Sequence, residues 1–489
     1  MGITIVGLGP GDPELVTRRA WRILSEADEV YLRTARHPGV EELPIKAYHS
    51  FDDWYDEAVD FDSLYRRIAA EIVRLGARPE GVIYAVPGHP LVGETTVSLI
   101  LEQASAQAIS VTVLDGLGFI EPTLAALGLD ALGGLQIHDA EAVAHLHHPP
   151  LNPDVPALLA QVYSGAVASD VKLTLANQYP DEHPVILVHG AGTAHQTLEQ
   201  VPLHALDQSR HIDHLTSLYV PPLARKGSFE HFQEIVAHLR APEGCPWDRK
   251  QTHESLRPYL LEETYEVLET LDADDTARLA KELGDLLLQI VLHTQIATEA
   301  GEFQMGDVIA HVTEKMIRRH PHVWGDVQVD GPEQVKVNWD QIKKQENAES
   351  NGGAPPSVLD GVPDTLPALA QAYNYHQRAA RTGFDWERIE DVVAKLHEEL
   401  DELLNADSDE ARAEELGDVL TVVVNLARWV RVDPETALRA SNRKFARRFR
   451  FIEQRAREQG QVLEGMTLSE MEVLWGEAKH DEQANGQGS

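Results

Sequence analysis

The stretch LLEETYEVLETLDADDTARLAKELGDLL at residues 260–287 decides the fold of the second half of this chain. A shortened copy, LHEELDELLNADSDEARAEELGDVL, follows at residues 396–420. Each copy begins with the pattern EExxE and continues, after a connecting loop, with ExxD. Apolar residues fall at helical spacing through both copies, which predicts two successive helices in each.

The two copies match in three ordered blocks. The EExxE glutamates recur 136 positions later, the ExxD residues recur 133 positions later, and a basic cluster recurs 129 positions later. Such ordered matches, with small changes in loop length, indicate an internal duplication. The matched residues are Glu262, Glu263 and Glu266 with Glu398, Glu399 and Glu402; Glu282 and Asp285 with Glu415 and Asp418; and Lys315, Arg318 and Arg319 with Lys444, Arg447 and Arg448.

The first 222 residues carry a different pattern. Short runs rich in β-branched residues predict strands, and helical patterns lie between several of them. This alternation predicts an α/β domain, whereas the chain after residue 222 is predicted to be all-α. The predicted strands are ITIVGLG at 3–9, VIYAV at 82–86, SVTVL at 110–114, VKLTLA at 171–176 and VILVHG at 185–190.

Two segments have the composition of interdomain linkers. VPPLARKGS at 220–228 contains a proline pair and small polar residues, and ESNGGAPPSVLDGVP at 349–363 is a longer example. We therefore predict a multidomain chain with three units. They span residues 1–222, 228–345 and 364–480.

Composition limits the possible partners. The 489 residues include 42 Lys and Arg against 79 Asp and Glu, a formal net charge of -37. This charge disfavours nucleic-acid polymers and anionic membrane surfaces, so chemistry on a phosphate would need added cations. A single cysteine, Cys245, cannot form an internal disulfide, and no apolar run approaches the length of a membrane span. We expect a cytoplasmic protein.

Several carboxylates are predicted to converge in each repeat. EExxE places its first and third glutamates one helical turn apart, on one face, and ExxD does the same on the next helix. Like charges at this spacing repel unless something neutralises them. Oxygen ligands without Cys or His favour Mg²⁺ or Mn²⁺ over Zn²⁺, and Mg²⁺ usually completes its shell with water and substrate phosphates. The pattern therefore predicts a phosphate ester or anhydride substrate.

The basic clusters supply complementary charge. Lys444, Arg447 and Arg448 lie within two turns of one helix, as do Lys315, Arg318 and Arg319, and each set is suited to clamp phosphate oxygens. Carboxylates with a basic clamp form a layout for phosphoryl transfer. The alternative is that each EExxE is merely a solvated helix face.

The helical part resembles the MazG family of nucleoside triphosphate pyrophosphohydrolases in its two-repeat form. The motifs are GCPWDRKQT at 244–252, ELGDLL at 282–287, RRHPHVW at 318–324 and NRKFARRF at 442–449, together with both EExxE patterns. The resemblance covers nearly all of residues 228–480. It implies helical bundles that form a homodimer, hydrolysis of an NTP to NMP and pyrophosphate, and Mg²⁺ bound by the five acids of each repeat. These acids are Glu398, Glu399, Glu402, Glu415 and Asp418, and Glu262, Glu263, Glu266, Glu282 and Asp285.

Both repeats keep all five acids, but we expect the second to dominate. Asn425 and Asn442 offer hydrogen bonds to a substrate, whereas the first repeat has Leu292 and Thr313 at the corresponding positions. There Glu399 and Glu402, with the clamp Lys444, Arg447 and Arg448, are the expected catalytic groups. Trp247, which lies before the first EExxE, is expected to be a packing residue.

The N-terminus carries a glycine-rich loop. Gly7 and Gly9 end the first predicted strand and Gly11 comes directly after it, with the spacing GxGxG, which differs from the GxGxxG fingerprint of dinucleotide-binding folds. No P-loop, GxSxG or HExxH pattern occurs. One interpretation is that the glycines serve only a tight connection between strand and helix.

This part of the chain also resembles a known family, the tetrapyrrole methylases. The resemblance rests on GLGPGDPELVT at 7–17, YAVPGHPLVGETT at 84–96 and DHLTSLYVPPL at 213–223, and covers residues 1–222. It implies two α/β lobes with S-adenosylmethionine between them. Many members carry an acidic turn where this chain has PGHP. The implied cofactor contacts are Gly7, Gly9, Gly11, Asp12, Pro87, Gly88, His89 and Gly93.

Three functional hypotheses follow. The first is a Mg²⁺-dependent NTP pyrophosphohydrolase with an appended methylase-like domain that binds S-adenosylmethionine. The second is an S-adenosylmethionine-dependent methyltransferase whose helical part serves dimerisation. The third is a non-catalytic assembly module, which would leave the carboxylates facing solvent.

Overall fold

The computed structural model describes residues 2–350 and 357–485, and it contains two compact units, Met1–Val308 and Ile309–Ser489. Each is described by itself. Of the longer predicted linker, residues 351–356 lie outside the described residues. No helix in the described ranges has the length and apolar character that a bilayer crossing requires.

The first lobe is a parallel five-stranded sheet in the order β3-β2-β4-β1-β5. Successive residues of β1 point to opposite faces, because Ile5 belongs to one buried core and Val6 to another. Both faces are therefore covered, as expected for a parallel sheet. The elements are β1 (Ile3–Gly7), α1 (Arg18–Glu26), β2 (Val30–Leu32), β3 (Tyr48–Ser50), α2 (Asp52–Glu57), α3 (Phe61–Gly76), β4 (Val82–Val86), α4 (Thr95–Ala106) and β5 (Val111–Val113).

The second lobe is a mixed sheet in the order β6-β7-β10-β8-β9. Only β6 and β7 pair in parallel, and the other pairs are antiparallel. Its core packs Leu159, Leu187 and Leu218 of three neighbouring strands against α7. The two separate sheets confirm the predicted two-lobed α/β domain. The elements are α5 (Ile120–Leu127), β6 (Gln136–Asp139), α6 (Ala140–Ala144), β7 (Ala157–Ala160), α7 (Gly165–Leu175), β8 (Pro184–His189), β9 (Thr197–Pro202) and β10 (Thr216–Val220).

One predicted strand is wrong. VKLTLA at 171–176 forms the second half of α7, which begins after the N-cap Ser164. The buried residues Val167, Val171 and Thr174 recur every three to four positions, which is the period of a helix with one buried face. The six residues at 171–176 are rich in β-branched types, which favours a strand. The helical period becomes visible only when all eleven residues of α7 are considered together.

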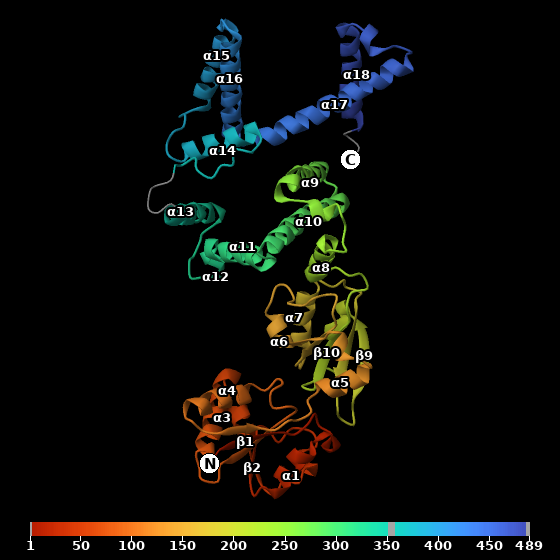
Figure 1. Ribbon diagram of the computed structural model, residues 1–489, viewed down its shortest axis with the longest axis vertical. Helices are drawn as coiled ribbons and strands as arrows, with labels where there is room; N and C mark the ends of the chain where they lie inside the picture. The colour runs from red at the N-terminus through yellow and green to blue at the C-terminus, as the bar shows by residue number, and fades with distance from the viewer. Residues whose placement is uncertain (1, 351–356, 486–489) are drawn as a thin grey trace. The chain divides into compact units, whose positions relative to one another are not determined.

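The chain after residue 222 contains helices and no strand among the described residues, as predicted. In each repeat, two long helices pack as a hairpin: α9 with α10, and α15 with α16 (Figure 1). The helices are α8 (Phe229–Arg240), α9 (His253–Ala273), α10 (Thr276–Ala300), α11 (Met305–Arg319), α12 (Pro321–Trp324), α13 (Pro332–Ser350), α14 (Ala368–Ala380), α15 (Ile389–Asn405), α16 (Asp409–Trp429), α17 (Pro434–Glu458) and α18 (Leu468–Asn485).

The hairpin turns have clear local causes. Asp274 adopts the left-handed conformation that ends α9, and Asp275 then caps α10 by accepting from the backbone N–H of Arg278. Ser408 caps α16 in the same way. These short turns bring the EExxE helix of each repeat alongside its ExxD helix.

Gly7 provides a test of packing in the first lobe. A Cβ at Gly7 would lie 2.5 Å from the carbonyl oxygen of Gly88 and 2.8 Å from Cδ of Pro90. We expect Gly7→Ala to lower the free energy of unfolding by roughly 1–3 kcal/mol, because rigid backbone and a proline ring must move. Thermal unfolding measures this. The control Gly133→Ala, where a Cβ meets nothing within 4 Å, should be near neutral, and equal stability of the two variants would contradict the packing role.

Candidate metal centres and cofactor crevice

Three carboxylates converge in the first repeat. Glu263 and Glu266 of α9 and Glu282 of α10 each offer an oxygen, and these oxygens lie within 4.8 Å of one another. Glu282 is only 2% exposed, and its Oε2 is buried without a hydrogen-bond partner among the described residues. A buried carboxylate oxygen without a partner is costly, so this atom fits a ligand such as a hard cation.

The second repeat places the equivalent residues together in the same way. Glu399 and Glu402 of α15 and Glu415 of α16 also lie within 4.8 Å, and Glu399 is 6% exposed. Three of the five acids predicted for each repeat therefore converge. The other two flank the cluster: Glu262 and Glu398 are exposed neighbours on the first helix, and Asp285 and Asp418 lie one turn further along the second.

Burial and the neighbouring carboxyls together perturb the clustered acids. Burial, followed by the charge of Asp285, raises the pKa of Glu263. A hydrogen bond with the Glu282 carboxyl raises the pKa of Glu266, and burial with the charge of Glu402 raises the pKa of Glu415. The clusters therefore retain protons more readily than isolated carboxyls do, and cation binding must release those protons.

The two repeats differ in their internal counter-charges. In the second, Nζ of Lys395 lies 2.8 Å from Oε1 of both Glu398 and Glu399. In the first, the corresponding position is Tyr259, and the cations lie further away: Arg278 Nε is 3.3 Å and Lys281 Nζ is 3.6 Å from Glu282. The second cluster thus has a closely bound ammonium group that the first lacks.

The predicted basic clamps each pair with an acid of the following helix. Arg318 and Arg319 of α11 bind Glu346 of α13, and Arg447 and Arg448 of α17 bind Glu482 of α18, at 2.6–2.7 Å. Glu346 and Glu482 are 136 positions apart, so the duplication extends to this last helix. Sequence reasoning missed these two acids, although they are separated by the same 136 positions as the two EExxE patterns, which was a usable signal. Contact between the clamps and the carboxylate clusters stays a prediction.

The remaining predicted substrate residues take different positions. Asn425 of α16 is 7% exposed, and its Oδ1 accepts from Nε of Arg428 at 3.0 Å. Its counterpart Leu292 is a buried core residue, so Asn425 is a polar substitution in a core position. Asn442 and Lys444 are exposed on α17, and Lys315 is half-buried on α11.

The predicted cofactor residues lie at one edge of the parallel sheet. Chain connections leave the neighbouring strands β1 and β4 toward opposite sides, and such a switch point is where open α/β sheets bind ligands. The loops after these strands, from Leu8 and from Pro87, touch: the N–H of Gly88 donates to the carbonyl of Gly9 at 2.8 Å. Gly7 is the last residue of β1, Gly9 and Gly11 belong to the first loop, and Pro87, Gly88, His89 and Gly93 belong to the second.

The glycines of this crevice have unequal roles. A Cβ at Gly11 would lie 2.8 Å from Thr193 of the second lobe, and one at Gly9 would lie 3.3 Å from a backbone carbonyl, so both are packing positions. Gly88 has φ of +64° and would meet nothing closer than 3.9 Å. Only Gly88 combines the left-handed conformation with space for a ligand.

Two other predicted contacts are already engaged locally. Asp12 accepts from the N–H of Glu14 and caps the short turn at Pro13–Leu15, while its own N–H donates to the carbonyl of Gly192 in the second lobe. His89 Nδ1 accepts from the N–H of Leu91. These residues shape the loops whether or not they touch a cofactor.

Sequence reasoning missed a buried polar group beside this crevice. Arg33, which follows β2, lies 3.0 Å from Glu94 and donates to the Tyr55 hydroxyl, and burial raises the pKa of Glu94. Burial also lowers the pKa of His37 to about 4, so this imidazole is neutral at neutral pH, and its Nε2 is buried without a described partner. Glu94 lies inside the motif at 84–96, but Arg33, His37 and Tyr55 stand in no recognisable motif, so only the fold could reveal that these side chains meet.

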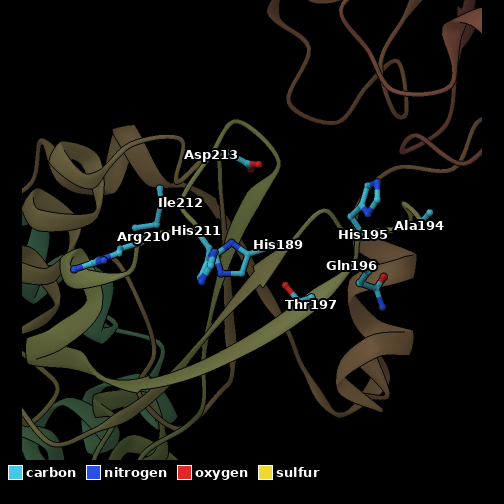
Figure 2. A pocket seen from close by; sticks show the side chains of 9 residues that line it. All are labelled: His189, Ala194, His195, Gln196, Thr197, Arg210, His211, Ile212 and Asp213. Carbon is cyan, nitrogen blue, oxygen red and sulfur yellow. The ribbon is translucent and has the colours of Figure 1, made fainter.

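A separate cavity of about 710 Å³ opens in the second lobe, where β9 begins (Figure 2). Figure 2 shows the His189 and His211 rings close together in it, while Arg210 points away from His195. His189 already bonds to Thr216 and Glu199. None of the residues predicted from the sequence lines this cavity.

Fold and site together define a two-module protein, in which a duplicated all-α carboxylate unit follows a two-lobed α/β domain. The chain belongs to the MazG family and carries a tetrapyrrole methylase domain at its N-terminus. It matches the MazG nucleotide pyrophosphohydrolase domain at residues 251–324 and 387–450, and the Tetrapyrrole (Corrin/Porphyrin) Methylases at residues 2–207. These ranges fall inside the three units expected from the sequence, whose boundaries stay a prediction.

The relatives show the same division. The chain is 42% identical to the uncharacterized protein YabN of Bacillus subtilis, over 98% of this chain and 99% of that protein. It is 44% identical to the nucleoside triphosphate pyrophosphohydrolase/pyrophosphatase MazG of Thermotoga maritima, over 51% of this chain and 95% of that protein. A uroporphyrin-III-C-methyltransferase structure from Thermus thermophilus aligns at 23% identity and a TM-score of 0.36, covering 45% of this chain and 94% of that one.

The raised carboxyl pKa values predict how a divalent cation affects stability. At pH values between the ordinary glutamate pKa of about 4.3 and the raised pKa values, the folded protein holds more protons than the unfolded chain. The free energy of unfolding therefore falls as the pH rises through that window. A bound cation offsets the negative charge that the carboxylates carry once their protons have left. Mg²⁺ should therefore raise Tm more near pH 7.5 than near pH 5. Thermal scans with KCl at matched ionic strength are the control, and an equal shift at both pH values would contradict the linkage.

Lys395 yields a second prediction for this site. Lys395→Met removes the ammonium group that competes for Glu398 and Glu399, so Mn²⁺ should bind the second cluster roughly fivefold more tightly. Titration followed by electron paramagnetic resonance measures this, in a chain whose first cluster carries Glu263→Gln and Asp285→Asn. Lys395→Arg keeps the charge and should bind as the parent does. Unchanged affinity in Lys395→Met would show that the ammonium group does not compete.

Proposed function

We propose that the helical part hydrolyses nucleoside triphosphates to nucleoside monophosphate and pyrophosphate, with Mg²⁺ or Mn²⁺ bound by the carboxylate clusters. The observation that carries this proposal is the convergence of equivalent acids in both repeats around largely buried carboxylates. A solvated helix face, or an assembly module, would leave these groups exposed. Glu282 and Glu399 are buried instead.

The residues divide the chemistry among them. Glu263, Glu266 and Glu282, or Glu399, Glu402 and Glu415, would hold the cation together with the flanking acids Glu262 and Asp285, or Glu398 and Asp418. When bound, the cation lowers the pKa of an attacking water and neutralises phosphate charge. One carboxylate of each cluster would accept the proton of that water and leave the others to hold the cation, and the raised pKa values favour Glu266 in the first repeat and Glu415 in the second for this role. Arginine and lysine groups of the clamps stabilise the leaving pyrophosphate.

An exposed apolar stripe supports a homodimer through the helical repeats. Leu283, Leu287 and Ile290 on α10 are each at least 38% exposed although they share one helix face. The equivalent residues Leu416, Leu420 and Val423 on α16 are exposed to a similar extent. The same stripe in both repeats favours burial against a second copy of this chain.

We further propose that the N-terminal domain binds S-adenosylmethionine at the crevice between the β1 and β4 loops. The open left-handed position at Gly88 and the unpartnered Nε2 of His37 support this placement. Isothermal titration of the full chain with S-adenosylmethionine tests it, and the absence of binding heat would overturn it. The unpaired Cys245 is consistent with a reducing compartment, and we place the protein in the cytoplasm.

Product analysis with paired variants tests the hydrolase. The full chain with Mg²⁺ and each NTP should release pyrophosphate, and chelation should abolish release. We expect Glu399→Gln with Asp418→Asn to reduce turnover at least about 100-fold, because two charged ligands are lost. The matched pair Glu263→Gln with Asp285→Asn should cost less, since the second repeat offers Asn425 and Asn442.

Two outcomes would contradict these expectations in different ways. Orthophosphate as the primary product, or turnover that persists in excess chelator, would overturn the proposed reaction. A larger loss from the first-repeat pair would leave the reaction intact and reverse the assignment of the dominant repeat. All four substitutions are nearly isosteric, so circular dichroism should show an unchanged fold.

A further inference from the structure

The segment 220–228 has the composition of an interdomain linker, but the structure holds it against the second lobe. The N–H of Leu223 donates to the carbonyl of Pro153 at 2.8 Å, and the Leu223 side chain packs on the core of that lobe. Four residues later, the N–H of Gly227 donates to Oδ1 of Asp154 at 2.9 Å. The covalent connection from the α/β domain to the first helical repeat is therefore bound to the second lobe at two points.

Asp154 binds the residues that start α8. Its Oδ2 accepts from the N–H of Ser228 at 3.2 Å and from the Ser228 hydroxyl at 2.7 Å, in addition to the Gly227 bond at Oδ1. Ser228 is the N-cap of α8 and is 4% exposed, and its Oγ accepts from the N–H of His231. Three donors thus converge on one carboxylate, and hydrogen bonds to a charged acceptor are roughly twice as strong as neutral ones.

The sheet of the second lobe holds Asp154 in place. The N–H of Asp154 donates to Oδ1 of Asn152, and the N–H of Asn152 donates to Oε1 of Gln136 on β6. Nε2 of Gln136 donates back to the carbonyls of Asn152 and Val155. Nδ2 of Asn152 also donates to Glu230 in the first turn of α8 at 3.1 Å. An unbroken chain of hydrogen bonds therefore runs from β6 to the N-terminus of α8.

α8 itself belongs to the core of the first repeat. Val236 of α8 is fully buried in one hydrophobic cluster with Leu256 of α9 and Val291 of α10. Phe229 and Phe232 of α8 pack against the same cluster. Packing thus ties α8 to the helical hairpin, while hydrogen bonds tie its first residues to the second lobe, and all of these elements lie in the first compact unit.

We propose that Asp154 joins the second lobe and the first helical hairpin into one cooperative unit, so that local unfolding of either one destabilises the other. Proteins open in such units, which often comprise neighbouring elements that share contacts. Coupling of this kind is reciprocal, so a ligand that stabilises the N-terminal domain also stabilises the hairpin that carries Glu263, Glu266 and Glu282. It requires neither the proposed hydrolysis nor the proposed cofactor binding.

The second repeat begins differently. α14 takes the place of α8 there, because each packs against the ExxD helix of its own hairpin, α16 or α10. α14 starts after Pro367, and no side chain caps its first turn. The amides of α16 therefore provide an internal reference from the other compact unit.

Hydrogen exchange of the full chain, resolved by mass spectrometry, tests the coupling through a double-mutant cycle. Leu187→Ala removes a fully buried side chain from the core of the second lobe. We expect it to accelerate exchange of the α8 and α10 amides by about tenfold or more, because the cavity destabilises the whole unit. In Asp154→Asn, which is nearly isosteric but replaces an acceptor with a donor, the same change should accelerate exchange by less than about twofold. Exchange in α16 should not respond.

Two further variants support this cycle. Asp139→Asn alters a carboxylate that caps α6 in the same lobe, so it is the matched control and should leave the response to Leu187→Ala intact. Val185→Ala, a smaller change in the same core, gives the same comparison where Leu187→Ala fails to fold. In the reverse direction, Val236→Ala on α8 should accelerate exchange of the β8 amides in the parent but not in Asp154→Asn. Exchange in α8 and α10 that ignores Leu187→Ala, or that responds equally in the parent and in Asp154→Asn, would overturn the proposal.

Discussion

Repulsion among the carboxylates at each helical hairpin is the constraint on which the second half of this protein depends. The turn at Asp274 and the cap at Ser408 fix the hairpins so that the acids of one helix face those of the next. Burying Glu282 and Glu399 removes water that would otherwise screen them. Each hairpin must therefore bind positive charge, in the form of protons, basic side chains or a cation. Its stability then depends on the pH and on the cation concentration.

The two repeats satisfy this constraint differently. In the first, the neighbouring Glu282 carboxyl raises the pKa of Glu266, and the ammonium group of Lys281 lies 3.6 Å from Glu282. In the second, Lys395 contacts two carboxylates directly. A proton leaves when a cation binds, whereas Lys395 remains part of the chain beside the cluster. The difference between Tyr259 and Lys395 at this one position thus changes the charge of the cluster.

Residue patterns predicted the coarse architecture because periodicity and motif spacing are local properties. EExxE and ExxD predicted which acids share a helix face. Of the five β-branched runs predicted to be strands, four are strands, among the ten strands of the described residues. VKLTLA failed because six residues are too short to distinguish a strand from a helix with one buried face. The group of Arg33, His37 and Glu94 could not be foreseen, since its members meet only through the sheet order β3-β2-β4. Similarly, the GxGxG spacing predicted a glycine-rich loop, but only the structure shows that Gly88 leaves space for a ligand whereas Gly9 and Gly11 pack against other atoms of the protein.

The pairing of each arginine pair with an acid of the following helix bears on selectivity. Each arginine pair forms ion pairs with one glutamate of the following helix: Arg447 and Arg448 with Glu482, and Arg318 and Arg319 with Glu346. The positive charge of each clamp is therefore partly neutralised within the protein, as is the negative charge of the carboxylate clusters. A phosphate that engages a clamp must displace such a glutamate, and a cation that enters the second cluster must displace Lys395. A single small ion compensates only one of these losses. If one ligand engages both the clamp and the cluster of a repeat, as proposed above, a triphosphate bound to a divalent cation offers both signs of charge, whereas free phosphate or a free cation offers only one.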